Sequence, residues 1–145
     1  MKILSSLVLV LAAGWISGCA TGPDHQVVSV PLNATHYNAG HIAHATLVPM
    51  GNETGIRIAV SGVPDSTTLP ARLFTYLYAG GCDGLSGKPA FSMNEIVRSD
   101  LHGPGMELVK VAPLPLNSLR SGKYALVVRG SAADGNHNLF CANVI

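Results

Sequence analysis

After residue 25 the chain consists mainly of short runs in which hydrophobic residues alternate with polar or small ones. The clearest run contains Ile56, Ile58 and Val60, which show the period of two expected of a strand with one buried face. Residues 51–55, Gly-Asn-Glu-Thr-Gly, join this run to the preceding one and predict a hairpin connection. Seven short strands are predicted in all: residues 26–32, 41–50, 56–60, 72–79, 107–111, 124–129 and 138–144. Their number and spacing predict an all-β fold, an antiparallel Greek-key β-sandwich or barrel.

One long segment, residues 80–105, interrupts the rhythm of strands and turns. It has 26 residues with six glycines and two prolines, and it contains Cys82. Unstructured segments of this length within a compact domain are usually functional or disordered. A second break, residues 113–122, predicts one helical turn around residues 117–119. We therefore expect one long loop and one short helical turn on a scaffold of strands.

The first 18 residues have the layout of an export signal. Lys2 is followed by a mostly apolar stretch, residues 3–16, which is shorter than the roughly 20 apolar residues of a membrane-spanning helix. Residues 16–19, Ile-Ser-Gly-Cys, resemble the bacterial lipobox, which implies cleavage after Gly18 and lipid attachment to Cys19. The alternative is an ordinary secretory signal followed by an accidental cysteine.

The lipobox resemblance divides the chain into a signal peptide at residues 1–18, a lipidated tether at residues 19–25 and a single β-sandwich domain at residues 26–145. The residue after the cysteine is Ala20 and not an aspartate, which by resemblance to the sorting rule of enteric bacteria favours the outer membrane. The expected partner is the lipid bilayer, which two or more acyl chains bind firmly.

Charge excludes one class of partner. The chain has 9 Lys and Arg and 8 Asp and Glu, and because Lys2 belongs to the leader, the remaining residues are formally neutral. They contain no basic run, so we expect no binding to nucleic acid.

Cysteine usage agrees with export. Once Cys19 is lipidated, Cys82 and Cys141 remain, and an even pair in an exported protein is most simply a disulfide. The alternative is two free thiols. A disulfide between them would tie the long loop to the last strand.

Three short motifs, at residues 81–82, 126–129 and 139–145, together resemble those of the copper/zinc superoxide dismutases. Residues 126–129, Leu-Val-Val-Arg, resemble a strand of that family that reads Leu-Val-Val-His, and residues 139–145 resemble its terminal strand, which holds one disulfide cysteine. Gly81-Cys82, followed by Gly87, Phe91 and Asn94, is similar to the loop that holds the other cysteine. The resemblance implies an eight-stranded Greek-key barrel with the disulfide loop packed over it.

The positions that should bind metal depart from this family. Tyr76 and Tyr78 stand where the resemblance places a His-x-His pair of copper ligands, and Arg129 replaces another copper ligand. Residues 87–91, where zinc histidines are expected, contain no histidine, and Asn138 replaces an arginine that guides the anionic substrate. A guanidinium cannot coordinate a metal ion. We therefore expect no cofactor and no catalytic activity.

Two hypotheses remain for Tyr76, Tyr78 and Arg129 if they converge. They form either a small anion-binding pocket, since arginine binds carboxylates and phosphates as a fork, or a structural plug of the former metal site.

The predicted function is thus a non-catalytic, membrane-anchored envelope lipoprotein with a binding or interaction domain. The alternative is a periplasmic copper- or zinc-binding protein that uses His36, His41 and His44, with possible help from His25. Surface histidines without a metal are the simpler interpretation of this group.

Overall fold

A computed structural model describes residue 18 and residues 26–85, 87–97, 100–102 and 105–145. The predicted lipid attachment site, Cys19, and the signal peptide apart from Gly18 lie outside the described residues. The strands are β1 (Val28–Ala34), β2 (Ala43–Met50), β3 (Glu53–Val60), β4 (Phe74–Ala79), β5 (Phe91–Ser92), β6 (Asp100–His102), β7 (Gly105–Ala112), β8 (Tyr124–Arg129) and β9 (Asn138–Val144). The helices are α1 (Leu116–Ser121) and the 3-10 turns η2 (His36–Asn38), η3 (Cys82–Gly84) and η4 (Ala132–Asp134).

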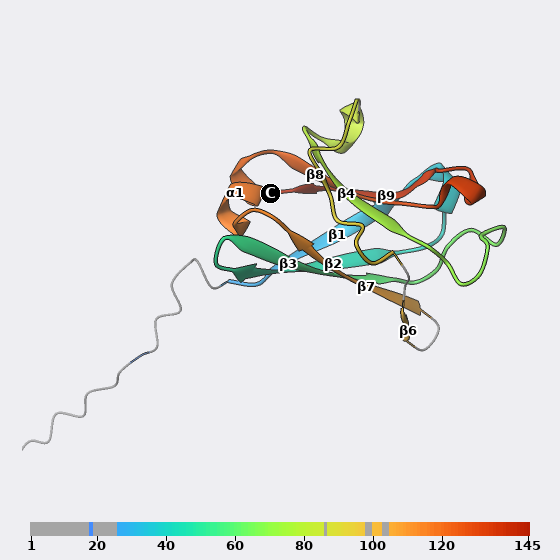
Figure 1. The fold of residues 1–145 in the computed structure, drawn as a ribbon, viewed down its shortest axis with the longest axis horizontal. Helices are drawn as coiled ribbons and strands as arrows, with labels where there is room; N and C mark the ends of the chain where they lie inside the picture. The colour runs from blue at the N-terminus through green and yellow to red at the C-terminus, as the bar shows by residue number, and fades with distance from the viewer. Residues whose placement is uncertain (1–17, 19–25, 86, 98–99, 103–104) are drawn as a thin grey trace, which may run out of the picture.

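All the described strand pairs are antiparallel, in the order β5-β4-β8-β9-β1-β2-β3-β7-β6. The sheet folds into two layers because β1 belongs to both: residues 28–32 pair with β2, and Asn33 and Ala34 pair with β9. Figure 1 shows β4, β8 and β9 in one layer, β2, β3 and β7 in the other, and α1 at one end. The chain passes from one layer to the other between β3 and β4, between β5 and β6 and between β7 and β8, so the two strands of each of these pairs are not neighbours. The predicted all-β Greek-key class is confirmed.

A hydrophobic core fills the space between the layers. Ile56, Ile58 and Val60 of β3 are at most 2% exposed, as their alternation predicts. Phe140 and Leu126, from β9 and β8, are fully buried in the same core. Burial of each such side chain contributes roughly 1.5–3 kcal/mol.

The segment predicted as one long loop contains two short strands, which corrects the prediction for residues 80–105. β5 pairs with β4 through Leu77 and Phe91, and β6 pairs with β7. Strands of two or three residues are too short to show a period in the sequence. The β2–β3 hairpin is also tighter than predicted: its loop is Gly51 and Asn52, and Gly51 has a φ of 70°, which favours glycine.

The two edge strands, β5 and β6, do not pair with each other, and residues 93–97 lie between them. The backbone N–H of Leu73 donates to the carbonyl of Val97 at 3.0 Å. Lys110, at a buried position of β7, donates its Nζ to the carbonyl of Ile96. Burial lowers the pKa of Lys110 below its ordinary value. These bonds make the barrel nearly closed.

The β4–β8–β9 layer is buried on its outer face as well as on its core face. Residues 125–128 of β8 are all fully buried, although alternate residues point to opposite sides. On the outer side the buried cluster consists of Tyr78, Ala125, Val127 and Cys141, with Tyr76, Cys82 and Leu85 partly buried against it. The segment that follows β4 covers this face (Figure 1).

A disulfide between Cys82 and Cys141 ties that segment to β9, with a Cα–Cα distance of 6.0 Å. The predicted bond is confirmed, and the alternative of two free thiols is wrong. Beside it, the backbone N–H of Cys82 donates to Oδ1 of Asn143 at 2.8 Å. A covalent bond and a hydrogen bond thus hold η3 against the last strand.

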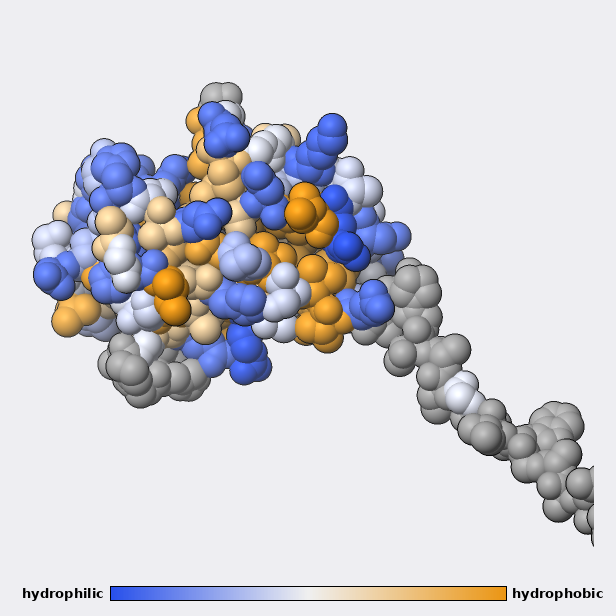
Figure 2. Space-filling view, turned by 180° about the vertical axis from the view of Figure 1, so that it is seen from behind, coloured by the Kyte–Doolittle hydropathy of each residue, from blue (hydrophilic) through white to orange (hydrophobic). Residues whose placement is uncertain are grey.

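Four exposed hydrophobic residues, Val48, Met50, Val109 and Val111, lie on the outer face of β2 and β7, and Val48 and Val111 both pair with Gly55 of β3. Figure 2 shows the side opposite to Figure 1, where hydrophobic residues are interspersed with polar ones. None of the helices in the described part of the chain is both long and apolar enough to cross a membrane.

Reduction of the disulfide is expected to lower the free energy of unfolding by up to about 4 kcal/mol. The reason is that the bond joins residues 59 apart and so restricts the unfolded chain. The shift of the urea unfolding midpoint on addition of dithiothreitol measures this effect. The double variant Cys82→Ala/Cys141→Ala is the control, since its midpoint should not respond to the reductant. An unchanged midpoint for the native sequence would contradict the prediction.

Candidate functional site

The three residues predicted to converge lie on the outer face of the β4–β8–β9 layer. Tyr76 and Tyr78 alternate along β4, and Arg129 ends β8. The register pairs the tyrosines with Val127 and Ala125, which are smaller and leave room above β8. The side chain of Arg129 can therefore extend across this face toward β4.

The guanidinium of Arg129 is held by two hydrogen bonds. Its Nη2 donates to the hydroxyl of Tyr78 at 2.6 Å, and its Nε donates to Oδ1 of Asn138 at 2.7 Å. Its Cζ also lies 4.8 Å from the ring centroid of Tyr76 and 5.7 Å from that of Tyr78. Cation–π contact and two charge-assisted hydrogen bonds together fix the orientation of the guanidinium.

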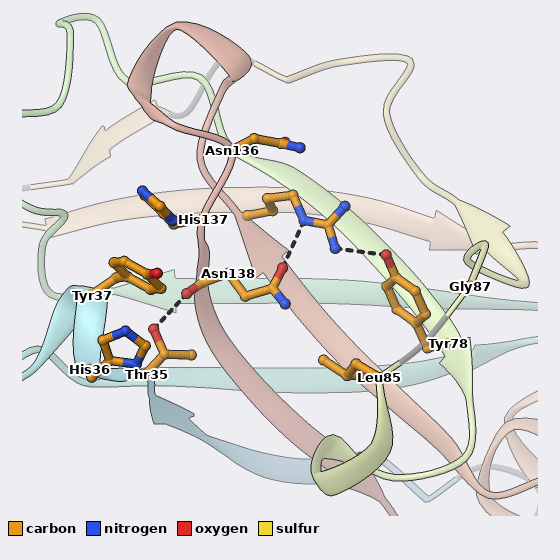
Figure 3. Close-up of a pocket in the computed structure, with 10 residues that line it drawn as sticks. Thr35, His36, Tyr37, Tyr78, Leu85, Gly87, Asn136, His137 and Asn138 are labelled. Atoms are coloured by element: carbon orange, nitrogen blue, oxygen red, sulfur yellow. Dashed lines mark hydrogen bonds between the residues drawn. The ribbon is translucent and has the colours of Figure 1, made fainter.

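The cluster lies at the side of a cleft with a volume of about 530 Å³. The lining residues come from segments far apart in the sequence: residues 35–37, Tyr78, residues 85 and 87, Arg129, and residues 136–138. Figure 3 shows Tyr78 and Leu85 on one side of the cleft, His36 and Tyr37 on the other, and Asn138 between them. Tyr76 is not among the lining residues. The structure thus brings Tyr76, Tyr78 and Arg129 together, and Tyr78 and Arg129 line a cleft.

Aromatic rings form the wall of the cleft opposite Tyr78. Tyr37 stacks on His137 with a centroid distance of 3.7 Å and an interplanar angle of 15°. On its other side, the ring of His36 lies 3.9 Å from Tyr37 at a tilt of 39° (Figure 3). A hydrogen bond of 2.5 Å from Oγ1 of Thr35 to the carbonyl of Asn138 joins the two segments that carry these rings.

The connection between β8 and β9 is fixed by Asp134. Its carboxylate accepts hydrogen bonds from the backbone N–H of Thr68 at 2.9 Å, the hydroxyl of Ser131 at 2.7 Å and the hydroxyl of Thr68 at 2.8 Å. These bonds, the one from the Thr68 backbone first, hold the pKa of Asp134 below its ordinary value. The turn that follows Asp134 contains Asn136 and His137, which line the cleft.

The histidines proposed as an alternative metal site are not brought together as ligands. His36 lines the cleft, whereas Nε2 of His44 is hydrogen-bonded to the hydroxyl of Ser29 on the other layer. His41 lies next to Gly62. Within the described ranges, no group of three or more His, Cys, Asp or Glu residues could hold a metal ion. His25 lies outside those ranges.

Several cleft residues were not predicted. Tyr37 and His137 are one hundred positions apart, and neither has a local pattern that indicates a site. Asn138 was singled out only as a substitution relative to the dismutases, yet it is the residue that bonds Arg129 Nε. The pairing of β1 with β9 brings these residues together, and no short-range signal reports that pairing.

Comparison of the chain with protein-family models, with curated proteins and with solved structures finds no significant match. The function must therefore be argued from the chemistry of the site.

Arg129→Ala is expected to lower the free energy of unfolding by about 2 kcal/mol. The substitution removes two hydrogen bonds from a charged donor and leaves the hydroxyl of Tyr78 without that partner. Thermal and urea unfolding measure the effect. The matched control is Arg120→Ala, which removes one hydrogen bond at the exposed surface and should change the stability by less than about 0.5 kcal/mol.

The two tyrosines offer a second control for the same prediction. Tyr78→Phe removes a hydroxyl that accepts from Arg129 and should cost about 1 kcal/mol. Tyr76→Phe removes a hydroxyl that bonds none of the described residues and should change the stability by less than about 0.5 kcal/mol. Equal effects of the two substitutions would show that the Arg129–Tyr78 bond contributes no stability.

Proposed function

We propose that the protein is a non-catalytic envelope lipoprotein, anchored in the membrane by acylated Cys19, whose domain is a degenerate copper/zinc superoxide dismutase-like module that serves binding or interaction. The observation that carries the proposal is the guanidinium of Arg129, fixed between Tyr78 and Asn138 on the outer face of β8.

The chemistry of this cluster does not suit a redox metal. A copper ion that cycles with superoxide needs several nitrogen donors with free lone pairs. Arg129 carries a permanent positive charge and no free lone pair, and the hydroxyl of Tyr78 already accepts a hydrogen bond from it. A second cation placed here would be repelled by the first.

The fold supports the resemblance on which the proposal rests. The resemblance implies a Greek-key barrel in which a disulfide loop packs over one layer. The chain has an antiparallel Greek-key arrangement in which the Cys82–Cys141 bond holds the segment after β4 over β8 and β9. Arg129 ends a buried strand, as the corresponding copper ligand would.

The proposed membrane anchor rests on the sequence. Residues 16–19 resemble a lipobox, and a disulfide between the other two cysteines suits an exported protein. Ala20 favours the outer membrane, with the domain held close to the bilayer by the short tether of residues 19–25.

Lipid attachment is tested by metabolic labelling of the expressed full chain with radioactive palmitate. Label is expected on the native sequence and absent from Cys19→Ser, because acylation needs the thiol of that residue. Cys82→Ala/Cys141→Ala is the control and should keep the label. An unlabelled native chain that is still cleaved and released in soluble form would refute the anchor.

The absence of dismutase activity is tested by superoxide turnover of the copper-loaded protein. After removal of unbound copper, the expected rate does not exceed that of the buffer alone, because Tyr76, Tyr78 and Arg129 offer no imidazole to a copper ion. Copper content is measured in parallel on a His36→Ala/His41→Ala/His44→Ala variant. Superoxide turnover by the native chain would falsify the proposal. Near-stoichiometric copper that the triple variant loses would replace it with the metal-binding alternative.

A further inference from the structure

We propose that the cleft beside Arg129 binds the carboxylate or phosphate group of a small solute, with the guanidinium as its main contact. This inference rests on the proposed function, since it names the ligand chemistry of the same non-catalytic domain.

The charge of the cleft favours an anion. Arg129 is the one Lys or Arg among the lining residues, and none of the lining residues is acidic. Arg129 forms no ion pair with any residue that the structure describes; its bonding partners, Tyr78 and Asn138, are neutral. A partly buried cation without a counter-ion binds an anion more strongly than a cation at an open surface does, because water screens it less.

Arg129 has donors left for a ligand. A guanidinium carries five N–H groups, and the bonds to Tyr78 and Asn138 use two of them. Of the described side chains, only Asn38 and Thr75 have a buried nitrogen or oxygen atom without a partner. None of the described residues bonds Nη1 of Arg129, and Nη1 is not among the buried atoms without a partner, so its two N–H groups are accessible at the cleft that this residue lines.

The geometry of the remaining donors suits a planar or tetrahedral oxyanion. Arginine pairs two N–H groups with two oxygens of a carboxylate or phosphate. The bonds to Tyr78 and Asn138 hold the guanidinium in place before a ligand arrives, which reduces the entropy that binding must overcome.

The rest of the cleft is suited to the body of a small solute. Its volume of about 530 Å³ is typical of small-molecule sites. The amides of Asn136 and Asn138 provide hydrogen-bond donors and acceptors, and the Tyr37–His137 stack provides an aromatic wall. The side chains that a solute would contact come from segments held by the Cys82–Cys141 and Thr35–Asn138 bonds.

The test is titration of the detergent-solubilised full-length protein with acetate and, separately, with inorganic phosphate at constant ionic strength. Saturable binding of either probe in the millimolar range is the expected result. Binding of acetate alone identifies a carboxylate site, and binding of phosphate alone identifies a phosphate site. Arg129→Gln should weaken the affinity at least about tenfold, because it removes the charge and the fork.

A second variant keeps the test decisive if Arg129→Gln does not fold. Asn136 is exposed at the edge of the cleft, and Asn136→Asp adds a negative charge with almost no change in shape. Repulsion of the probe should weaken binding about fivefold or more. The matched control is Asn117→Asp on α1, which makes the same change at an exposed position that is not part of the cleft and should leave the affinity unchanged.

Three outcomes would overturn the inference: neither probe binds saturably, a folded Arg129→Gln variant keeps the native affinity, or Asn136→Asp and Asn117→Asp weaken binding equally. Failure of the proposed function gives a different signature, namely superoxide turnover or near-stoichiometric copper. A protein that binds neither anion and turns over no superoxide refutes the anion site and leaves the non-catalytic proposal intact.

Discussion

The covalent link between Cys82 and Cys141 is the constraint on which the covered outer face of the β4–β8–β9 layer depends. A β-sandwich ordinarily leaves the outer faces of its layers in water. Here the disulfide holds the segment after β4 against β9, and the outer residues of β8 become as buried as those of the core. This covered face is the environment in which Tyr78 and Arg129 meet. Without the covering segment, both would lie on an open sheet surface, where a guanidinium is solvated and its hydrogen bonds are worth little.

The sequence suggested two alternative roles for Arg129, a structural plug and an anion-binding residue. The covered face explains how Arg129 can fill both. A structural plug needs hydrogen bonds that satisfy Arg129, and an anion site needs donors that remain free. The guanidinium has enough N–H groups for both: two bond Tyr78 and Asn138, and those of Nη1 bond none of the described residues and are accessible. The two roles therefore support each other, because the structural bonds orient the donors that a ligand would use.

The scaffold was predictable from the sequence because its signals are local. Alternation in residues 56–60 identifies β3, and the even pair of cysteines identifies the disulfide. β5 and β6 were missed because strands of two or three residues show no period. The cluster of Tyr76, Tyr78 and Arg129 was predictable only by resemblance, since nothing within either strand indicates that the other lies beside it.

The cleft itself was beyond prediction because its two walls meet only through the closure of the barrel. Tyr37 follows β1 and His137 precedes β9. The short pairing of Asn33 and Ala34 with β9 places the rings of Tyr37 and His137 in contact. That pairing exists because β1 leaves β2 after residue 32 and crosses to the other layer. A strand shared between two layers has no signature in its own sequence, because buried and exposed residues alternate along each half as they do in any strand. The site therefore arises where the topology changes, at the point where β1 passes from one layer to the other.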